Sequence, residues 1–338
     1  MTQTSTIARG GGNPSAPSRR RKGVPPRGSG LPDWVVPYVL LLPGLLIIGA
    51  LLLYPLYQMV DMSFHKVGLR QIKVTNPQPA EFLGLENYQK IFESDLFWSS
   101  LRNTVVFAVV TVALTLILGT LVGLLLNKLG KKMSTFVIIG IMAAWATPPT
   151  ARAIIWKWLF DSSSGIVNWA LNLLPDWLSS LVFGRSDWSE HPWFNDTFTL
   201  YLVLTIAVVW ASFPFIAVSV LAGLKSISAE LYEAAKMDGS TGFTTFRKVT
   251  FPLLKPVFSV LTVLSIIWDF KVFTELYLLN GGTVNRDAFN LSLWSYAEAF
   301  SSPPKMGLGA AIAVVLTAIL MVITFVYVRQ IVKTEDVR

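Results

Sequence analysis

The chain has 338 residues, of which 53% are apolar and only 14% are charged. Soluble domains carry about 25% charged residues, so this composition excludes an ordinary water-soluble fold. The formal net charge of +8 is typical of basic cytoplasmic loops in a membrane protein, and we expect no nucleic-acid partner. The chain has no cysteine and two histidines, which excludes disulfides and thiolate metal sites and argues against any metal centre.

Residues 1–33 are polar, basic and rich in Pro, Gly and Ser, which predicts a disordered cytoplasmic tail. The apolar run from Val35 to Val60 contains no charge. It is too long for a signal-peptide core and no small-residue cleavage site follows it. It therefore predicts a retained first membrane span.

Six segments within residues 34–334 approach the roughly 20 apolar residues that cross a bilayer. The fold predicted from them is an all-α, polytopic membrane domain. Two segments are irregular, because Pro148-Pro149 interrupts the third and the fifth passes into charge at Asp269. The predicted spans are 35–60, 104–127, 133–158, 197–224, 253–273 and 306–328.

Lys and Arg are unevenly distributed between the loops. If the N-terminus is cytoplasmic, 17 of the 28 lie in the tail, in 128–132, in 225–255 and from Arg329 onward. Since positive loops stay in the cytoplasm, we expect both termini there. Segment 160–196 then faces outward, and its four tryptophans predict a helix at the lipid headgroup level. They are Trp169, Trp177, Trp188 and Trp193.

The most informative segment, residues 225–252, joins spans four and five. Ser228 suits the N-cap of a helix Ala229–Met237, and Gly239 suits a left-handed C-cap. A second helical piece then leads into span five, with Pro252 in its first turn. From the pattern alone, a hairpin that docks on another protein and a solvated connector are equal alternatives.

The same segment closely resembles the EAA loop of ABC-importer permeases, in which Glu-Ala-Ala is followed by Asp-Gly, a Phe and a Pro before the membrane. The matching residues are Glu233, Ala234, Ala235, Asp238, Gly239, Phe246 and Pro252. The resemblance implies that these residues form a coupling hairpin. Such a hairpin docks on a separate ATP-hydrolysing subunit, whose closure then moves spans four and five as a rigid body.

Three further stretches resemble the carbohydrate-uptake branch of that family, and the likeness covers most of the chain beyond the tail. They are Gly84–Tyr88 with Asn103-Thr104, Pro148 and Trp156–Phe160 with Gly165–Asn168, and Phe270–Phe273 with Tyr277–Gly282. Thr283 stands where the family often has Pro, and Asp287-Ala288 replaces a Ser/Thr pair. These departures lie in the outer loop after span five and concern the cargo.

The chain carries no nucleotide-binding motif. Its nearest sequence, Gly130–Met133, lacks the upstream Gly and the hydroxyl that holds Mg²⁺. We therefore expect no cofactor and no catalytic residue in this chain, with ATP and Mg²⁺ bound by a partner. Six helices enclose no pathway alone, which implies a second, homologous permease subunit. The resemblance adds an ABC ATPase dimer, an extracytoplasmic sugar-binding protein and a location in the bacterial cell membrane.

Charged side chains inside spans are costly and mark substrate pathways. A carboxylate beside aromatic rings suits a sugar, and the backbone freed by the proline break is tolerated only at protein or at a water-filled cavity. The candidate pathway residues are Trp145, Pro148, Arg152, Trp268, Asp269, Lys271 and Phe273. Lys271 and Glu275 are spaced to pair along a helix. The alternative is that these charges anchor the outer end of span five and that the tryptophans form an interfacial belt.

The sequence thus predicts the permease subunit of an ATP-driven importer that moves a sugar by alternating access. Glycerol phosphate, a polyol or an oligopeptide is an alternative cargo, but a phosphorylated one calls for several cations and only Arg152 and Lys271 are available. A polytopic glycosyltransferase would need paired carboxylates, which Asp61, Asp176 and Asp187 do not form. A structural membrane anchor leaves the hairpin unexplained.

Overall fold

The computed structural model describes residues 32, 34–72 and 78–335. The described chain is helical apart from loops and two short strands, which confirms the predicted all-α membrane fold. The predicted disordered tail lies outside the described residues except for Pro32 and therefore stays a prediction. Within the described chain, five helices are long and apolar enough to cross a membrane, and a bent pair supplies a sixth span.

The chain divides into two units, residues 1–55 and 56–338. The first unit holds α1 (Val36–Ile48) and the π-helical turn η1 (Gly49–Leu53), and α2 (Tyr54–Ser63) continues the same apolar helix. The remaining candidate spans belong to the second unit. Their bounds are α5 Asp95–Lys128, α6 Lys131–Trp145 with α7 Pro149–Leu159, α10 Thr197–Ser226, α13 Phe251–Phe270 with α14 Thr274–Leu279, and α16 Met306–Glu335.

Helices α5 and α10 form the centre of the second unit, because small residues bring their backbones close together. A Cβ atom added at Gly119 would lie 2.5 Å from the Cβ of Ile216, and one at Gly123 would lie 2.9 Å from the carbonyl oxygen of Ala217. Packing of this kind is typical of membrane helices, which gain little from burying apolar side chains. Helices α6 and α13 pack against this pair.

The third span is broken as the paired prolines predict. Helix α6 ends at Trp145, α7 begins at Pro149, and their axes are bent by 92°. The fifth span is interrupted as well, since α13 ends at Phe270 and α14 begins only at Thr274. The two interruptions place non-helical backbone on neighbouring elements, because α7 packs against α14.

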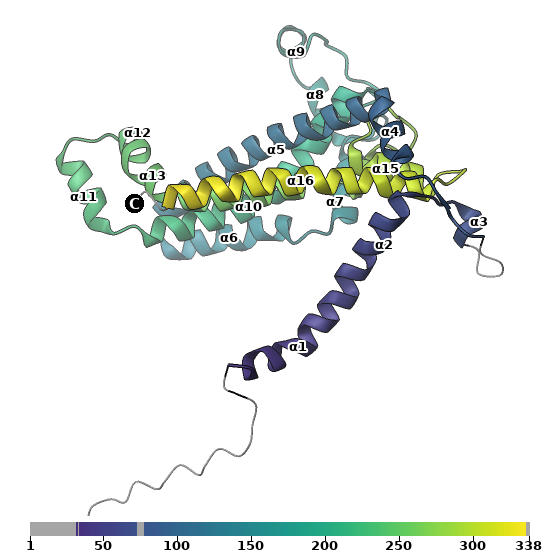
Figure 1. Ribbon diagram of the computed structural model, residues 1–338. Helices are drawn as coiled ribbons and strands as arrows, with labels where there is room; N and C mark the ends of the chain where they lie inside the picture. The colour runs from purple at the N-terminus through teal and green to yellow at the C-terminus, as the bar shows by residue number, and fades with distance from the viewer. Residues whose placement is uncertain (1–31, 33, 73–77, 336–338) are drawn as a thin grey trace, which may run out of the picture. The chain divides into compact units, whose positions relative to one another are not determined.

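Figure 1 shows the two ends of this unit. One end, here called the hairpin end, carries α11 (Ala229–Met237) and α12 (Gly242–Thr245). The other, here called the loop end, carries α3 (Leu69–Ile72), α4 (Glu86–Glu93) and α15 (Leu291–Phe300). Two short strands also lie there and pair antiparallel, with His65 opposite Phe82. They are β1 (His65–Lys66) and β2 (Glu81–Phe82).

Segment 160–196 carries α8 (Ile166–Asn172) and α9 (Asp176–Phe183), so the predicted helix there is confirmed as two short helices. Its tryptophans do not form one belt. Trp188 and Trp193 are buried and stack with ring centroids 5.5 Å apart, whereas Trp169 and Trp177 are exposed. The expectation of four interfacial tryptophans is therefore wrong for Trp188 and Trp193, which pack in the hydrophobic core.

Candidate functional site

A pocket of about 290 Å³ lies at the two interruptions, between α7, α10 and the α13–α14 break. We call it the bend pocket. Six of the seven candidate pathway residues line it, and Pro149 takes the place expected for Pro148. The charged and aromatic residues of its wall are Trp145, Arg152, Trp268, Asp269, Lys271, Phe273 and Glu275.

Arg152 and Glu275 form a buried ion pair across this pocket, joining α7 to α14. The predicted pairing of Lys271 with Glu275 is therefore wrong, because the helix ends at Phe270 and the two residues do not share an α-helical turn. A second bond joins the same two helices, since Lys157 Nζ donates to the carbonyl oxygen of Leu278 at 3.0 Å. The pair neutralises Arg152, so that Lys271 carries the uncompensated positive charge on the wall.

Asp269 is only 4% exposed, yet within the described chain no hydrogen bond or ion pair reaches its carboxylate. Burial of a polar group without a partner is costly, so its position suits a hydroxyl or water that enters the pocket. Beside it, Trp268 lies edge-on to Phe215 at 5.4 Å, and Phe215 stacks on Trp145 at 6.0 Å. The wall thus combines a buried acceptor with a row of aromatic rings.

The segment 225–252, here called the interspan hairpin, folds as its sequence predicts. Helix α11 has the predicted bounds, and Gly239 follows it with φ of +73°, a conformation that favours glycine. The amide of Ser240 donates to the carbonyl oxygen of Ala235 at 3.0 Å and closes the turn. Ser228 occupies the N-cap position but its side chain makes no capping bond.

The second helical piece and Pro252 lie where they were predicted. Helix begins at Gly242 and runs through a π-helical turn, η2 (Phe246–Thr250), into α13. Pro252 is in the first turn of α13, and no break in helical backbone separates it from the preceding piece. The wider turn precedes the residue that lacks an N–H, where the α-helical bond pattern cannot continue unchanged.

The EAA-loop residues are divided between the surface and the inside of the interspan hairpin. Glu233, Ala234, Asp238 and Gly239 are exposed, whereas Ala235 is buried. Phe246 and Pro252 are half-buried, and Phe246 contacts Phe251. Only Ala234 of the alanine pair therefore offers the small, open face expected of both.

Two large apolar side chains of the interspan hairpin were not singled out from the sequence. Met237 is 87% exposed and Phe243 is 75% exposed, on either side of the Gly239 turn. They add apolar surface to a segment that is otherwise rich in polar and charged residues. Their position next to the Asp-Gly turn could have identified them.

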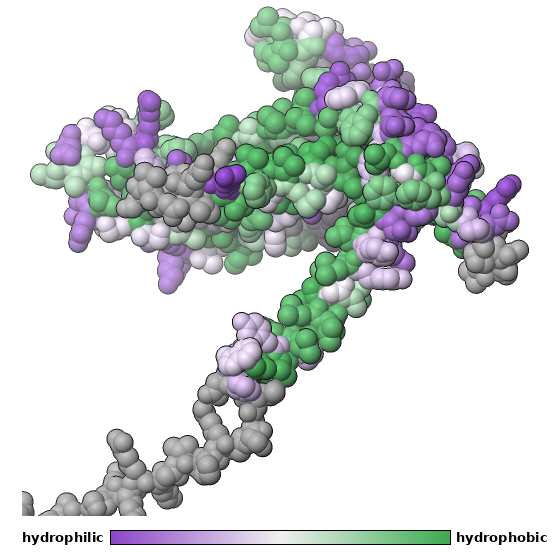
Figure 2. Space-filling view, viewed as in Figure 1, coloured by the Kyte–Doolittle hydropathy of each residue, from purple (hydrophilic) through white to green (hydrophobic). Residues whose placement is uncertain are grey.

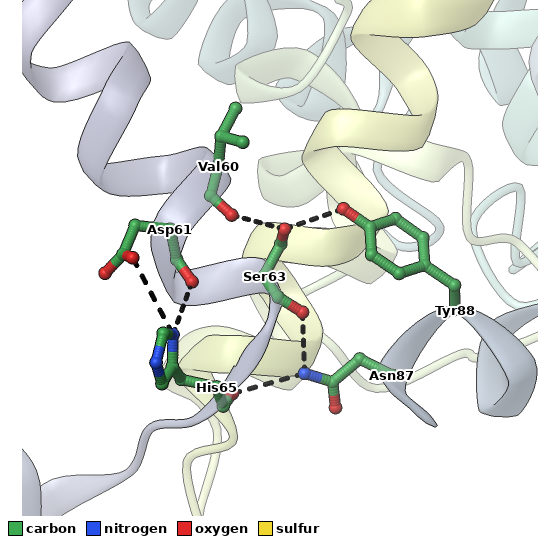
Figure 3. A network of polar contacts seen from close by, with 6 residues as sticks. All are labelled: Val60, Asp61, Ser63, His65, Asn87 and Tyr88. Carbon is green, nitrogen blue, oxygen red and sulfur yellow. Dashed lines mark hydrogen bonds and ion pairs between the residues drawn. The ribbon is translucent and has the colours of Figure 1, made fainter. Parts of the chain in front are cut away.

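The family-like stretches at the loop end hold the backbone together through buried amides. Figure 3 shows the first: Asn87 Nδ2 donates to the carbonyl oxygens of Ser63 at 2.9 Å and His65 at 3.2 Å, and the Tyr88 hydroxyl lies 2.6 Å from Ser63 Oγ. His65 in turn contacts the Asp61 carbonyl oxygen at 2.7 Å. These bonds fix α4 to the segment that follows α2.

The second such amide belongs to Asn103, which donates to the carbonyl oxygens of Asp287 at 2.8 Å and Phe289 at 3.0 Å. Asn168 accepts from the Trp193 indole at 2.5 Å. The position where the family pattern is broken, Asp287, therefore contributes its backbone to the packing of α5. Asn87, Asn103 and Asn168 thus position backbone at the loop end, and none of the three lines the bend pocket.

Comparison with known proteins identifies the class. The family described as "Binding-protein-dependent transport system inner membrane component" matches residues 115–334. The diacetylchitobiose uptake system permease protein DasB of Streptomyces coelicolor is 34% identical over 96% of this chain and 97% of its own length. The trehalose/maltose transport system permease protein MalF of Thermococcus litoralis is 30% identical over 86% and 92%, respectively.

A solved structure supports the fold. The crystal structure of a bacterial ABC transporter involved in the import of the acidic polysaccharide alginate superposes with a TM-score of 0.70, at 20% identity, over 88% of this chain and 95% of that one. The chain belongs to the family of inner membrane components of binding-protein-dependent transport systems. It is a multi-pass membrane permease subunit.

Proposed function

We propose that this chain is one permease subunit of an ATP-driven sugar importer and that the bend pocket contacts the cargo during passage. The observation that carries the proposal is the convergence of Asp269, Trp268 and Trp145 on one pocket. Sugars present hydroxyl groups to a carboxylate and C–H faces to aromatic rings. The relatives named for diacetylchitobiose and for trehalose/maltose uptake favour the same cargo class.

The size and charge of the bend pocket limit the range of molecules that could be its cargo. About 290 Å³ is at the lower end of ligand-site volumes, so the pocket holds one part of a sugar chain at a time. The ion pair with Glu275 occupies Arg152, which leaves Lys271 to face the cargo as the remaining cation. One cation is too few for a phosphate group, which disfavours glycerol phosphate.

The assembly follows from the interspan hairpin. In this proposal the hairpin end is cytoplasmic, in line with the five Lys and Arg of residues 225–255, and both termini are cytoplasmic too. Ala234, Met237 and Phe243 enter a cleft on an ABC ATPase dimer, which binds ATP and Mg²⁺. A second, homologous permease subunit closes the pathway, and an extracytoplasmic binding protein delivers the sugar to the loop end. The chain thus lies in a bacterial cell membrane.

The cargo proposal is tested by uptake in cells that carry the whole transporter. We expect Asp269→Asn and Trp268→Ala to raise the KM for a radiolabelled disaccharide drawn from a panel of maltose, trehalose and chitobiose-type sugars. Asp95→Asn, an exposed carboxylate outside the bend pocket, is the matched control and should leave KM unchanged. If Asp269→Asn lowered membrane abundance and uptake equally, Asp269 would anchor the outer end of span five and would not contact the cargo. If the transporter took up glycerol phosphate and none of the sugars, the sugar assignment would be wrong.

A further inference from the structure

The paired helices α8 and α9 each bury a polar residue and expose most of their large apolar side chains. The buried residue of each helix is polar: Asn168 in α8 and Ser179 in α9. The large apolar side chains point away, with Trp177 69% exposed and Leu181 76% exposed. The other large apolar residues exposed here are Ile166, Trp169, Leu173, Val182 and Phe183.

The buried polar side chains hold these helices onto the segment that returns to α10. Ser179 Oγ donates to the carbonyl oxygen of Arg185 at 2.8 Å and accepts from the Trp188 indole at 2.9 Å. Asn172 Oδ1 accepts from the Trp188 amide at 2.8 Å. These bonds engage Ser179 and Asn172, and the exposed face of the two helices carries mainly large apolar side chains, with Asp176 and Ser180 as its polar members.

The location of the outward face favours lipid over water. In Figure 1, α9 projects sideways from the bundle, clear of α5 and level with that helix, and does not extend beyond its loop end. Residues 166–184 contain a single charged side chain, Asp176. Figure 2 shows hydrophobic surface over α9. Both tethers of this segment are spans, since it follows α7 and precedes α10, so its apolar face continues the membrane-facing surface.

We propose that α8 and α9 form a lipid-embedded paddle, which inserts Trp169, Trp177 and Leu181 into the bilayer leaflet at the loop end. Tryptophan and aliphatic side chains without basic residues suit the headgroup–acyl boundary and require no anionic lipid. The paddle fixes the depth of segment 160–196 and thereby of Arg152 and Lys157 on α7, which contact α14. It rests on membership of the membrane family and not on the sugar cargo.

The absence of cysteine from the chain makes the test direct. A nitroxide is attached to Leu181→Cys in the whole transporter, reconstituted in uncharged phosphatidylcholine vesicles, and its collision rates with oxygen and with a water-soluble nickel complex are measured. Lys131→Cys, at an exposed lysine beside the short turn between α5 and α6, is the water-exposed control, and Val109→Cys, exposed on α5, is the membrane control. We expect the oxygen-to-nickel ratio at Leu181 to exceed that at Lys131 several-fold and to resemble that at Val109.

Two outcomes would overturn the paddle. A ratio equal to that at Lys131 would place the face in water. Low collision rates with both probes, rising when the binding protein is omitted, would make it a protein-docking surface. Neither result depends on transport, so failure of the paddle and failure of the proposed cargo are distinguishable. As a second readout, brominated lipids should quench part of the tryptophan fluorescence, and Trp177→Ser should reduce the quenched fraction.

Discussion

Arg152 and Glu275 show how single residues join the two interrupted spans. Both side chains are largely buried, at 13% and 6% exposure, and they come from α7 and α14. A buried ion pair contributes little net stability, but loss of one partner leaves a charge without compensation. The main effect of the pair is therefore to select one arrangement of α7 and α14. Its contribution to the stability of that arrangement is small.

This view predicts the result of a double-mutant cycle. We expect Glu275→Leu and Arg152→Met each to cost about 3–5 kcal/mol, because each leaves the other residue as a buried charge without a partner. The double substitution Arg152→Met with Glu275→Leu should recover most of that loss. The change in stability of each variant is measured by thermal unfolding of the purified protein in detergent. Additive losses in the double variant would show that the two residues do not act as a pair.

His191 predicts a pH dependence of the paddle's tether. Burial, followed by the charge of Arg185, lowers the pKa of His191 below its ordinary value, although Asp196 opposes this shift. Arg185 Nη1 lies 2.5 Å from His191 Nδ1, which suits a neutral ring that accepts the bond. A pKa that is lower in the folded state means that protonation favours opening. The stabilisation is therefore full above the unfolded pKa of about 6.5 and declines as pH falls below it.

Hydrogen exchange measures that decline. Corrected for intrinsic rates, residues 185–193 should exchange faster at pH 5.5 than at pH 7.5. His191→Gln should abolish the difference, whereas His65→Gln, far along the chain in the contact of Figure 3, should keep it. A pH response that survives His191→Gln would refute the assignment.

At the scale of elements, local signals predicted the interspan hairpin better than the spans. The bounds of α11 follow from Ser228 and Gly239, which act within a few residues of the helix. Helix α5 begins at Asp95 and not at Thr104, because hydropathy locates the membrane core while the helix continues into polar residues.

Tertiary structure decided what the pattern could not. The Lys271–Glu275 pairing failed since α13 ends at Phe270, and the partner of Glu275 comes from residue 152, remote in sequence. Six of the seven residues named from the sequence line the bend pocket, because proline breaks and intramembrane charges are both visible in the sequence, and their role in a substrate pathway stays a prediction. The pairing of the charges could not be predicted from the sequence, because it depends on the packing of α7 against α14.

The turn after α11 gives a prediction for the interspan hairpin. Gly239 has φ of +73°, where a side chain is strained by about 1–2 kcal/mol, and aspartate adds charge at the docking turn. We expect Gly239→Asp to abolish uptake while the protein still inserts. Gly242→Ala, three residues on with ordinary φ and open space, is the control and should retain uptake. Unchanged transport and ATPase association in Gly239→Asp would count against the coupling role.

The contact between α5 and α10 gives a prediction about the stability of the second unit. A Cβ at Gly119 meets Ile216 at 2.5 Å, so Gly119→Ala should destabilise the helix pair by about 1–3 kcal/mol through overpacking. Gly140 on α6 has nothing within 4 Å, and Gly140→Ala should be neutral or slightly stabilising. The effects of Gly119→Ala and Gly140→Ala are compared through the midpoints of thermal unfolding in detergent. Equal effects would show that α5 and α10 do not pack through Gly119.

Over the whole molecule, the fifth candidate span connects the two candidate sites. Gly242–Leu279 spans 38 residues, with part of the interspan hairpin at its start and Asp269 and Glu275 of the bend pocket near its end, on either side of the break after Phe270. Under the proposed function, movement imposed on Phe243 would be carried along α13 toward the pocket. The ion pair with Arg152 joins α14 to the broken third span.

The proposed function requires that a nucleotide-hydrolysing subunit bind the interspan hairpin from the cytoplasm. The most direct measurement is cross-linking from Ala234→Cys in the native membrane, with Asp187→Cys in segment 160–196 as control. We predict an adduct between residue 234 and an ATPase subunit, changed in yield by ATP, and no labelling of residue 234 by an impermeant maleimide added outside. Labelling from outside, or an ATPase adduct only at residue 187, would contradict the account.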